Sequence, residues 1–253
     1  MPKLIGVLAL IWVYIASASE VTGGSAQLKV QPFDPSEEGF VAIFNGRDLT
    51  GWQGLPDFWS VTDGAISGHE TKEASRQTFL VFNGVTPADF ELRLKYKFTT
   101  PRGNSGVQFR SKVLDSTNWR VGGYQADFDA QGGVDGSIYD EAGVAGNREV
   151  MSRRGEKTIW RSSNERREET LGGGVANLAQ SININDWNDV SLRIEGDHFE
   201  YRINGHLMTE MIDDAAESLH HGVIAFQLHQ GFTMEILFKD VRMKFLSAPQ
   251  PKP

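Results

Sequence analysis

Asn104-Ser-Gly-Val-Gln-Phe-Arg110 and Tyr124-Gln-Ala-Asp-Phe-Asp129 alternate apolar and polar residues, and Gly136-Ser-Ile-Tyr-Asp-Glu141 follows them closely. Successive side chains of a β-strand point to opposite faces, so each segment predicts a strand whose polar residues share one face. Several such strands side by side would form a polar, hydrogen-bonding surface on an otherwise apolar sheet. A carbohydrate-binding or carbohydrate-cleaving face has this character.

The rest of the chain also favours strands. It has 253 residues, 40% of them hydrophobic, and it contains 27 glycines, which suits one large all-β domain. The clearest strand is Phe90–Phe98, where apolar and charged residues alternate. Turn signals such as Asp63-Gly64 and Asn204-Gly205 separate about a dozen expected strands. This spacing favours a β-sandwich or jelly roll.

The charge and the missing cysteines exclude several functions. The formal net charge is −8, whereas binding to a phosphate backbone relies on Lys and Arg, so we expect no nucleic acid partner. The chain has no cysteine, so disulfides, thiolate metal sites and a Cys nucleophile are absent. There is also no Gly-x-Ser-x-Gly elbow, P-loop or His-Glu-x-x-His signature.

The amino terminus has the pattern of an export signal. Lys3 precedes the apolar segment 4–15, and Ala16-Ser17-Ala18 is an A-x-A cleavage site. A membrane anchor is the alternative, but this segment is shorter than the roughly 20 residues that span a bilayer. We therefore predict a signal peptide over 1–18 and an exported protein, periplasmic or extracellular, with no membrane partner after cleavage.

The sequence predicts three further regions. A tether rich in Gly, Ser, Thr, Pro and Glu covers 19–38, one folded domain covers 39–247, and a short tail covers 248–253. Within the domain, 143–180 is rich in arginine and has no convincing period. We interpret it as a long surface excursion with one short strand around 158–161.

Several segments of the domain, taken in order, resemble the 3-keto-disaccharide hydrolase family. The resemblance spans roughly residues 38–246. Each matching segment is weak alone, but their order and spacing are specific. They are Gly39–Trp52, Asn104–Ser111, Gly123–Phe128, Gly136–Glu141, Asp186–Asp189, Gly222–His229 and Phe238–Arg242.

The resemblance implies a concanavalin A-like jelly roll of two antiparallel sheets. It also implies cleavage of glycosides whose glucose ring has first been oxidised to a 3-ketone. Such a ketone acidifies the proton on C2, so that a base can remove it, the aglycone can leave by elimination, and water can then add. The site needs a base, a stabiliser for the enolate oxygen and an acid for the leaving group.

The candidate residues follow from the polar faces of the expected strands. The candidate catalytic residues are Asp127, Glu141 and His229. The candidate substrate-binding residues are Gln108, Arg110, Gln125, Tyr139, Gln227 and Trp119. Gln108 and Arg110 are two residues apart, so they would share one face of a strand. Gln227 and His229 have the same spacing on a separate strand.

Each candidate has a structural alternative. Gln108 and Arg110 could line a solvated outer face, Asp127 could pair with an arginine, Tyr139 could pack with its hydroxyl at the surface, and His229 could be a structural histidine. Asp140 and Glu141 point opposite ways in a strand, so we assign Glu141 to chemistry and Asp140 to structure.

Aromatic and metal-binding candidates complete the list. Trp52 and Trp59 fit a core position better than a sugar platform, and Trp119 is the better platform. Asp127, Asp129 and Asp135 lie among glycines, as calcium ligands do, but their register does not match an EF-hand. We predict no cofactor and no metal in the active site, and we leave a structural calcium ion open.

The sequence thus predicts an exported enzyme that cleaves 3-keto-glycosides, with an oligosaccharide or glycoside as its ligand. A non-catalytic carbohydrate-binding module is the alternative, because this fold class includes lectins and enzymes. An ordinary glycosidase with two carboxylates about 5–9.5 Å apart is a third reading. No pattern in the sequence predicts an oligomeric state.

Overall fold

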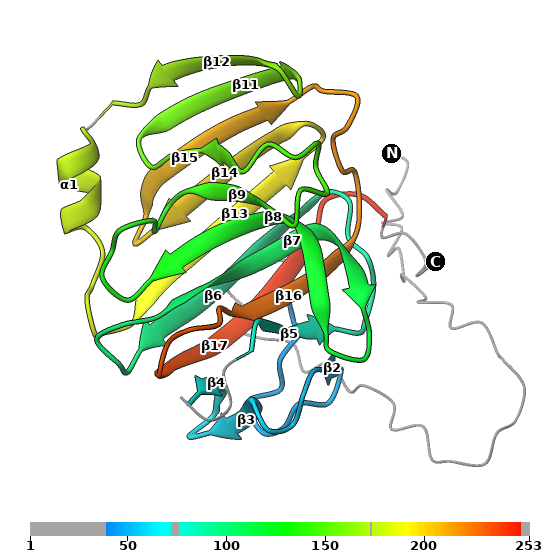
Figure 1. Ribbon diagram of the computed structural model, residues 1–253, viewed down its shortest axis with the longest axis vertical. Helices are drawn as coiled ribbons and strands as arrows, with labels where there is room; N and C mark the ends of the chain where they lie inside the picture. Colours follow the sequence, from blue (N-terminus) through cyan, green and yellow to red (C-terminus); the bar gives the residue numbers. More distant parts are fainter. Residues whose placement is uncertain (1–38, 72–75, 173, 249–253) are drawn as a thin grey trace, which may run out of the picture.

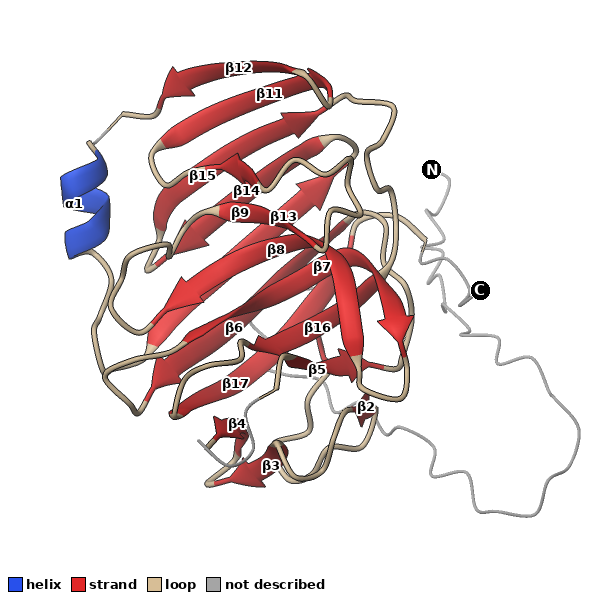
Figure 2. Ribbon diagram, viewed as in Figure 1, coloured by secondary structure: helices blue, strands red, loops and turns tan. Residues whose placement is uncertain are grey.

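The computed structural model describes residues 39–71, 76–172 and 174–248, and it shows two β-sheets packed face to face (Figures 1 and 2). The sequence prediction of an all-β jelly-roll sandwich is confirmed. The predicted signal peptide, the tether and the tail beyond residue 248 lie outside the described residues. No helix in the described part of the chain is long and apolar enough to cross a membrane.

The larger sheet has ten strands within the described residues. Nine follow one path, in which every pairing is antiparallel except that of β11 with β15, and β1 (Val41–Ala42) pairs with β17 beside it. The path is β12 (Glu165–Thr170), β11 (Glu156–Ser162), β15 (His206–Asp213), β14 (His198–Ile203), β13 (Asn188–Glu195), β6 (Phe90–Phe98), β17 (Met234–Phe245), β4 (Ala65–Glu70) and β3 (Trp59–Thr62).

The smaller sheet has seven strands, all antiparallel, in the part of the chain that the structure describes. Their order is β10 (Val150–Ser152), β9 (Ile138–Glu141), β8 (Arg120–Asp129), β7 (Asn104–Asp115), β16 (Val223–Leu228), β5 (Thr78–Phe82) and β2 (Trp52–Gln53). The short helix α1 (Val175–Gln180) lies beside the sandwich at one end of both sheets (Figure 2).

Alternating side chains build the core between the sheets. In β6 every second residue is buried from Phe90 to Phe98, as the sequence pattern predicts. The two sheets meet through stacked rings: Phe226 lies 4.0 Å from Phe238, and Tyr96 lies 4.0 Å from Phe128, centroid to centroid. Such aromatic pairs contribute about 0.5–1.5 kcal/mol each beyond the burial of their area.

The arginine-rich segment differs from its prediction. The expected strand around 158–161 exists as part of the longer β11, and the region also forms β10, β12 and helix α1. Several of its arginines form ion pairs, among them a buried bidentate pair between Arg148 and Asp213. The excursion therefore extends both sheets of the sandwich instead of forming a loop over its surface.

The outer face of the smaller sheet carries the polar residues of the sequence pattern. In β7 and β8 the apolar partners Val107, Phe109 and Phe128 belong to the core, so the intervening side chains point away from the larger sheet. On that outer face, Gln108 and Gln125 are paired across the two strands. These two glutamines are buried although they lie outside the core, which means that other groups cover them.

Candidate active site

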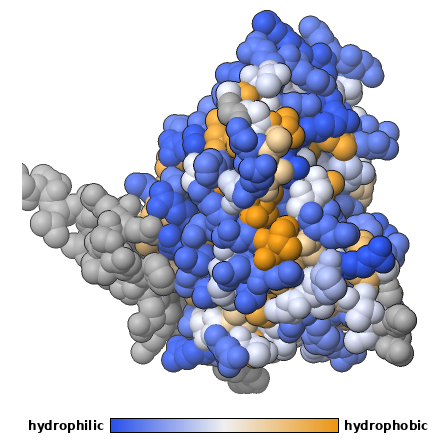
Figure 3. Space-filling view, turned by 90° about the vertical axis from the view of Figure 1, so that its left-hand side faces the viewer, coloured by the Kyte–Doolittle hydropathy of each residue, from blue (hydrophilic) through white to orange (hydrophobic). Residues whose placement is uncertain are grey.

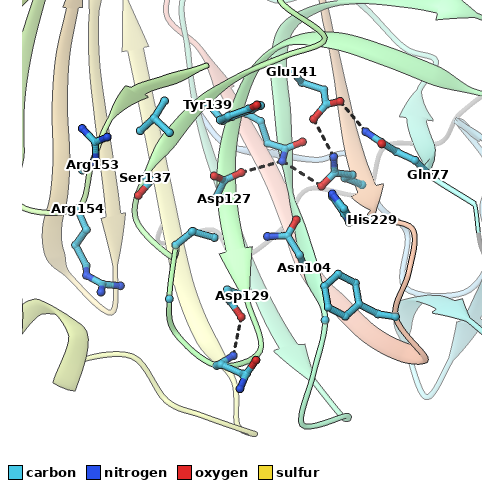
Figure 4. A pocket seen from close by; sticks show the side chains of 18 of the residues that line it. Gln77, Asn104, Asp127, Asp129, Ser137, Tyr139, Glu141, Arg153, Arg154 and His229 are labelled. Atoms are coloured by element: carbon cyan, nitrogen blue, oxygen red, sulfur yellow. Dashed lines mark hydrogen bonds between the residues drawn. The ribbon is translucent and has the colours of Figure 1, made fainter. Parts of the chain in front are cut away.

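A cavity of about 810 Å³ lies on the outer face of the smaller sheet (Figure 4). Its floor comes from β8, β9 and β16, and its walls come from the 131–134 loop, the turn after β10 and the residues after β16. The polar and charged side chains that line it are Gln77, Asn104, Gln125, Asp127, Asp129, Gln131, Ser137, Tyr139, Glu141, Arg153, Arg154, Gln227 and His229.

The cavity brings together six of the nine predicted site residues. Asp127, Glu141 and His229, the predicted catalytic residues, all line it, as do the predicted binding residues Gln125, Tyr139 and Gln227. They come from three strands and one strand end, because β8, β9 and β16 each present one polar face here. Figure 4 shows Asp127, Tyr139, Glu141 and His229 around the same space.

A chain of side-chain amides connects the two carboxylates. Gln125 Nε2 donates to Asp127 Oδ1 at 2.8 Å and to Gln227 Oε1 at 3.1 Å. Gln227 Nε2 in turn donates to Glu141 Oε2 at 3.1 Å, and Gln77 Nε2 donates to Glu141 Oε1 at 2.6 Å. Because each amide in the chain has a fixed donor and acceptor side, the positions of both carboxyl groups are fixed.

Gly106 leaves space for these hydrogen-bonded glutamine side chains. A Cβ at Gly106 on β7 would lie 2.6 Å from Gln125 Cγ and 2.7 Å from the carbonyl oxygen of Ala126. Any larger residue at position 106 would therefore push the Gln125 side chain away from Asp127. The Asn-Ser-Gly segment of the sequence thus has a steric role beneath the site.

Asp127 is a buried acid. Burial raises its pKa to about 8, and the negative charges of Glu141, Asp135 and Asp129 act in the same direction, while the hydrogen bond from Gln125 opposes them. At neutral pH the carboxyl group is therefore mostly protonated. Gln125 occupies Oδ1, so Oδ2 is the oxygen that can carry the proton toward a ligand. This group has the properties of a general acid.

Glu141 has a different environment. Burial raises its pKa, and the hydrogen bond from Gln77, the charge of His229, and the hydrogen bond from Gln227 oppose that rise. Both oxygens accept hydrogen bonds from amides, which favours the ionised form. Asp140, its neighbour, accepts hydrogen bonds from the backbone N–H groups of Ala145 and Arg148 instead. The assignment of Asp140 to structure agrees with this placement.

His229 offers one free nitrogen to the cavity. Its Nδ1 lies 2.8 Å from the carbonyl oxygen of Gln230, and a carbonyl only accepts, so Nδ1 carries the hydrogen. In the neutral ring Nε2 then has an available lone pair, as a general base requires. The backbone N–H of His229 donates to the carbonyl of Asn104 at 3.3 Å, which ties the end of β16 to the start of β7.

Two of the polar groups that line the cavity without a protein partner among the described residues are suited to donate to a ligand. These are the hydroxyl of Tyr139 and the side-chain amide of Asn104, and both residues line the cavity. Burial, followed by the charges of Glu149, Glu141 and Asp127, raises the pKa of Tyr139, so its hydroxyl stays protonated as a donor. Sequence reasoning placed Asn104 in a strand but did not identify it as a site residue.

Arg110 was predicted to bind substrate, and the structure places it elsewhere. Its guanidinium donates to the carbonyls of Ala88, Gly196 and Leu219 and pairs with Asp89, and it lies over the ring of Phe199 in the larger sheet. The cause is local: Arg110 has a positive φ of 47°, and the pairing of β7 with β8 shifts register between Phe109 and Lys112. The expected alternation therefore stops before Arg110.

Gln108 and Trp119, two further predicted binding residues, also lie outside the cavity lining. Gln108 is fully buried and donates to Gln125 Oε1 at 2.6 Å, so it helps to fix the position of the Gln125 side chain. Trp119 packs on an apolar cluster on the same sheet face, and it does not line the cavity. That cluster consists of Phe79, Val81, Val121, Val223 and Ala225.

The structure gives the calcium hypothesis no ligand set. Asp127 accepts from Gln125, Asp135 accepts from the Tyr96 hydroxyl and from the Asp129 backbone N–H, and Asp129 accepts from the Gln131 backbone N–H. The three carboxylates thus have separate partners. Among the residues that the structure describes, no group of three or more His, Asp or Glu side chains is arranged to hold a metal ion.

A two-sheet β-sandwich with a polar cavity on one sheet is an architecture that proteins acting on carbohydrates use. The chain belongs to the family of 3-keto-alpha-glucoside-1,2-lyase-like domains, whose model matches residues 39–244. The resemblance that the sequence motifs indicated is thereby confirmed, and a carbohydrate-active role is supported. No curated protein matches the sequence.

Solved structures show the same fold at low sequence identity. An inferred glycosyl hydrolase from Parabacteroides distasonis ATCC 8503 has a TM-score of 0.55 and 18% identity over 87% of this chain and 100% of its own. The carbohydrate-binding module CBM66 from Bacillus subtilis has a TM-score of 0.51 and 16% identity over 77% of this chain and 95% of its own. A Bacillus subtilis protein with a galectin-like fold has a TM-score of 0.52 and 10% identity, over 81% and 92%.

Proposed function

We propose that this protein cleaves 3-keto-glucosides by removing the proton on C2 and eliminating the group on C1. The observation that carries the proposal is the pairing, in one cavity, of a buried acid with a raised pKa and an imidazole with a free nitrogen. Asp127 supplies the acid and His229 the base. Elimination next to a ketone requires both.

The base step uses His229. Its Nε2 takes the C2 proton, which the neighbouring C3 ketone makes acidic, and the electron pair moves into an enolate. The imidazolium that forms lies close enough to Glu141 for its charge to lower the pKa of that carboxyl. In its ionised form Glu141 stabilises the protonated ring, and the amides of Gln77 and Gln227 keep its carboxyl group in place.

The negative charge then develops on the oxygen attached to C3. Tyr139 and Asn104 carry donor groups without a partner among the described residues, and they are positioned in the cavity by β9 and by the start of β7. Donors that are already oriented toward a developing oxyanion stabilise it without further reorganisation. We assign the stabilisation of the enolate to these two residues.

The leaving step uses Asp127. The enolate collapses, the C1–O1 bond breaks, and the proton on the Asp127 carboxyl passes to the departing oxygen. The products are an alcohol and a sugar with a C1–C2 double bond conjugated to the ketone. Addition of water across that double bond places OH on C1 and H on C2, which gives the 3-keto sugar and completes a net hydrolysis.

A non-catalytic binding module is the second candidate, and the similarity of the fold to that of CBM66 supports it. The two functions make different demands on Asp127. Burial of a carboxyl group costs stability, and sugar binding by itself does not require a carboxyl group that gives up its proton. An elimination needs one.

Turnover separates the two candidates. The purified protein is incubated with a 3-keto-glucoside, and release of the aglycone is followed beside the same glucoside with an unoxidised ring. We expect release from the 3-keto substrate alone, because only its C2 proton is acidic. Binding of both compounds without release of either would support the binding module. Equal release from both would support an ordinary glycosidase.

A further inference from the structure

The mechanism uses one side of the cavity and leaves the other side unassigned. Figure 4 shows Arg153 and Arg154 across the cavity from Glu141 and His229. Both arginines belong to the turn between β10 and β11, within the arginine-rich segment that the sequence left without a function. With a volume of about 810 Å³, the cavity falls in the range of about 300–1,000 Å³ that is typical of pockets for drug-sized ligands.

Exposed apolar side chains line the same cavity as the two arginines. Five large hydrophobic residues are exposed among those that the structure describes, and two of them, Val134 and Val175, line this cavity. A third, Ile184, lies 3.4 Å from the Cβ position at Gly132, in the loop that carries Val134. Figure 3 shows apolar side chains, in orange, within a largely hydrophilic surface on the side of the molecule that carries α1. Grouped exposure of this kind is typical of a binding surface.

Arg154 connects two of the segments that form this side of the cavity. Its Nη1 donates to the carbonyls of Gly132 at 2.8 Å and Asp135 at 2.9 Å, which fastens the 131–135 loop to the turn after β10. On the other side, a Cβ at Gly155 would lie 2.7 Å from Val175 Cγ2, so that the turn and the start of α1 are in close contact. The 131–135 loop, the turn after β10 and the start of α1 therefore pack together as one side of the cavity.

Arg153 has a fixed backbone and an available side chain. Its N–H donates to Glu156 Oε2 at 2.9 Å, and its carbonyl accepts from the Thr209 hydroxyl at 3.1 Å. The side chain is 57% exposed, and its guanidinium is 4.0 Å from Glu156, the outer limit of an ion pair. Glu156 is already bound by Arg166 at 2.7 Å. The Arg153 guanidinium is thus free to bind an anion.

We propose that this end of the cavity is a leaving-group subsite for an aglycone with an apolar body and a carboxylate. Val134 and Val175 contact the body, and Arg153 binds the carboxylate. The two valines favour an apolar aglycone over a second sugar ring, whose hydroxyls form no hydrogen bonds with valine side chains. The inference rests on the proposed function, since it assigns the group that departs from C1.

The test compares two substrates that differ in one charge. These are the 3-keto-glucosides of 4-hydroxybenzoate and of its neutral amide, and the ratio of their kcat/KM values is measured for each variant. We expect Arg153→Ala to lower this ratio by about twofold to tenfold, the range for a partly exposed ion pair. Arg167→Ala is the matched control, because Arg167 is 74% exposed on the edge strand β12 and loses the same charge.

A second variant tests the apolar wall without removing an arginine. Val175→Asp places a negative charge beside the proposed carboxylate, and Val175 is half exposed, so the fold should tolerate it. We expect the same ratio to fall, again by at least about twofold. An unchanged ratio in both Arg153→Ala and Val175→Asp would overturn the subsite.

Binding keeps this inference separate from the proposed reaction. The unoxidised glucoside of 4-hydroxybenzoate is titrated into the wild-type protein and into Arg153→Ala by calorimetry. If no 3-keto-glucoside is cleaved but binding weakens in Arg153→Ala, the proposed reaction is wrong and the subsite stands. If 3-keto-glucosides are cleaved but Arg153→Ala binds and discriminates like wild type, the subsite is wrong and the reaction stands.

Discussion

Asp127 and Glu141 are joined through two glutamine side chains. Asp127 Oδ1 accepts from Gln125, Gln125 donates also to Gln227, and Gln227 donates to Glu141 Oε2, with distances of 2.8, 3.1 and 3.1 Å. The two carboxyl groups have different environments although they share this network. One is a protonated acid at neutral pH, and the other accepts two amide hydrogen bonds.

Breaking this network should affect stability and activity together. Gln125→Leu removes both donors and leaves Asp127 and Gln227 without their partner, so we expect the free energy of unfolding to fall by about 1–3 kcal/mol. We also expect kcat to fall by about tenfold, because the acid loses its orientation. Urea unfolding and steady-state kinetics measure the two effects. Gln53→Leu, on the exposed side of β2, is the matched control.

The double variant gives a sharper result. Gln125→Leu and Gln227→Leu act on the same network, so their combined cost should be smaller than the sum of the two single costs. Strict additivity would show that the two glutamines act independently, contrary to the network described here.

Asp127 should set an alkaline limit on activity. Because the acid must be protonated and its pKa is about 8, kcat/KM should decline as pH rises through about 8. Asp127→Asn should lower the rate by about 10²–10⁴-fold and remove this limb of the profile. Asp189→Asn, at an exposed carboxylate on β13, is the control. A limb near pH 8 that persists in Asp127→Asn would assign it to another group.

The same carboxyl group should make the protein less stable at high pH. The unfolded aspartate ionises near pH 4, whereas the folded one ionises near 8, so between these values the folded state binds one more proton. Stability therefore declines as pH rises from about 4 to about 8. Asp135, with a pKa of about 7, contributes in the same direction. The pH dependence of urea unfolding should become shallower in Asp127→Asn.

His229 should be replaceable by an external base. His229→Gln removes the proton acceptor, and we expect kcat to fall by about 10²–10⁴-fold. In His229→Ala, which leaves a space the size of the imidazole ring, added imidazole should restore part of the rate. His206→Gln, at an exposed position in β15, should behave like wild type. Full activity in His229→Gln would assign the base to Glu141, the remaining predicted catalytic residue.

Arg110 should matter for folding and not for substrate binding. Arg110→Leu leaves three backbone carbonyls and Asp89 without their donor, at a site where the guanidinium is only 2% exposed. We expect a loss of about 3–5 kcal/mol in unfolding free energy, the usual cost of removing one partner of a buried ion pair. The KM of the folded fraction should stay at the wild-type value. A raised KM with wild-type stability would restore the original assignment.

The sequence predicted what depends on local pattern. Strand β6 occupies Phe90–Phe98 as expected, because apolar and charged residues alternate without interruption. One face of the strand is therefore apolar and the other is charged. The polar faces of β8, β9 and β16 were found for the same reason, and they carry six of the nine predicted site residues. The family resemblance added the expected chemistry, which alternation alone does not define.

The predictions that were wrong concern residues whose position depends on contacts distant in the sequence and not on the local pattern. Arg110 fits a strict alternation, but a positive φ at that residue turns its side chain toward the larger sheet. Strands β11 and β12 have charged faces without a regular period, and β11 pairs in parallel with β15, more than 40 residues later. Arg153 and Arg154 reach the cavity only because these strands fold back, so no nearby sequence signal marks them.

The most direct test of the proposed reaction is the fate of the hydrogen on C2. A 3-keto-glucoside is cleaved in D₂O, and the released 3-keto sugar is examined at early times by mass spectrometry and NMR. A matched sample of that sugar, without the protein, corrects for spontaneous exchange. Elimination followed by hydration predicts deuterium at C2 of the product, to the extent that the proton on His229 exchanges with solvent before hydration. Equal release of the aglycone from an analogue that carries no hydrogen on C2 would contradict the mechanism.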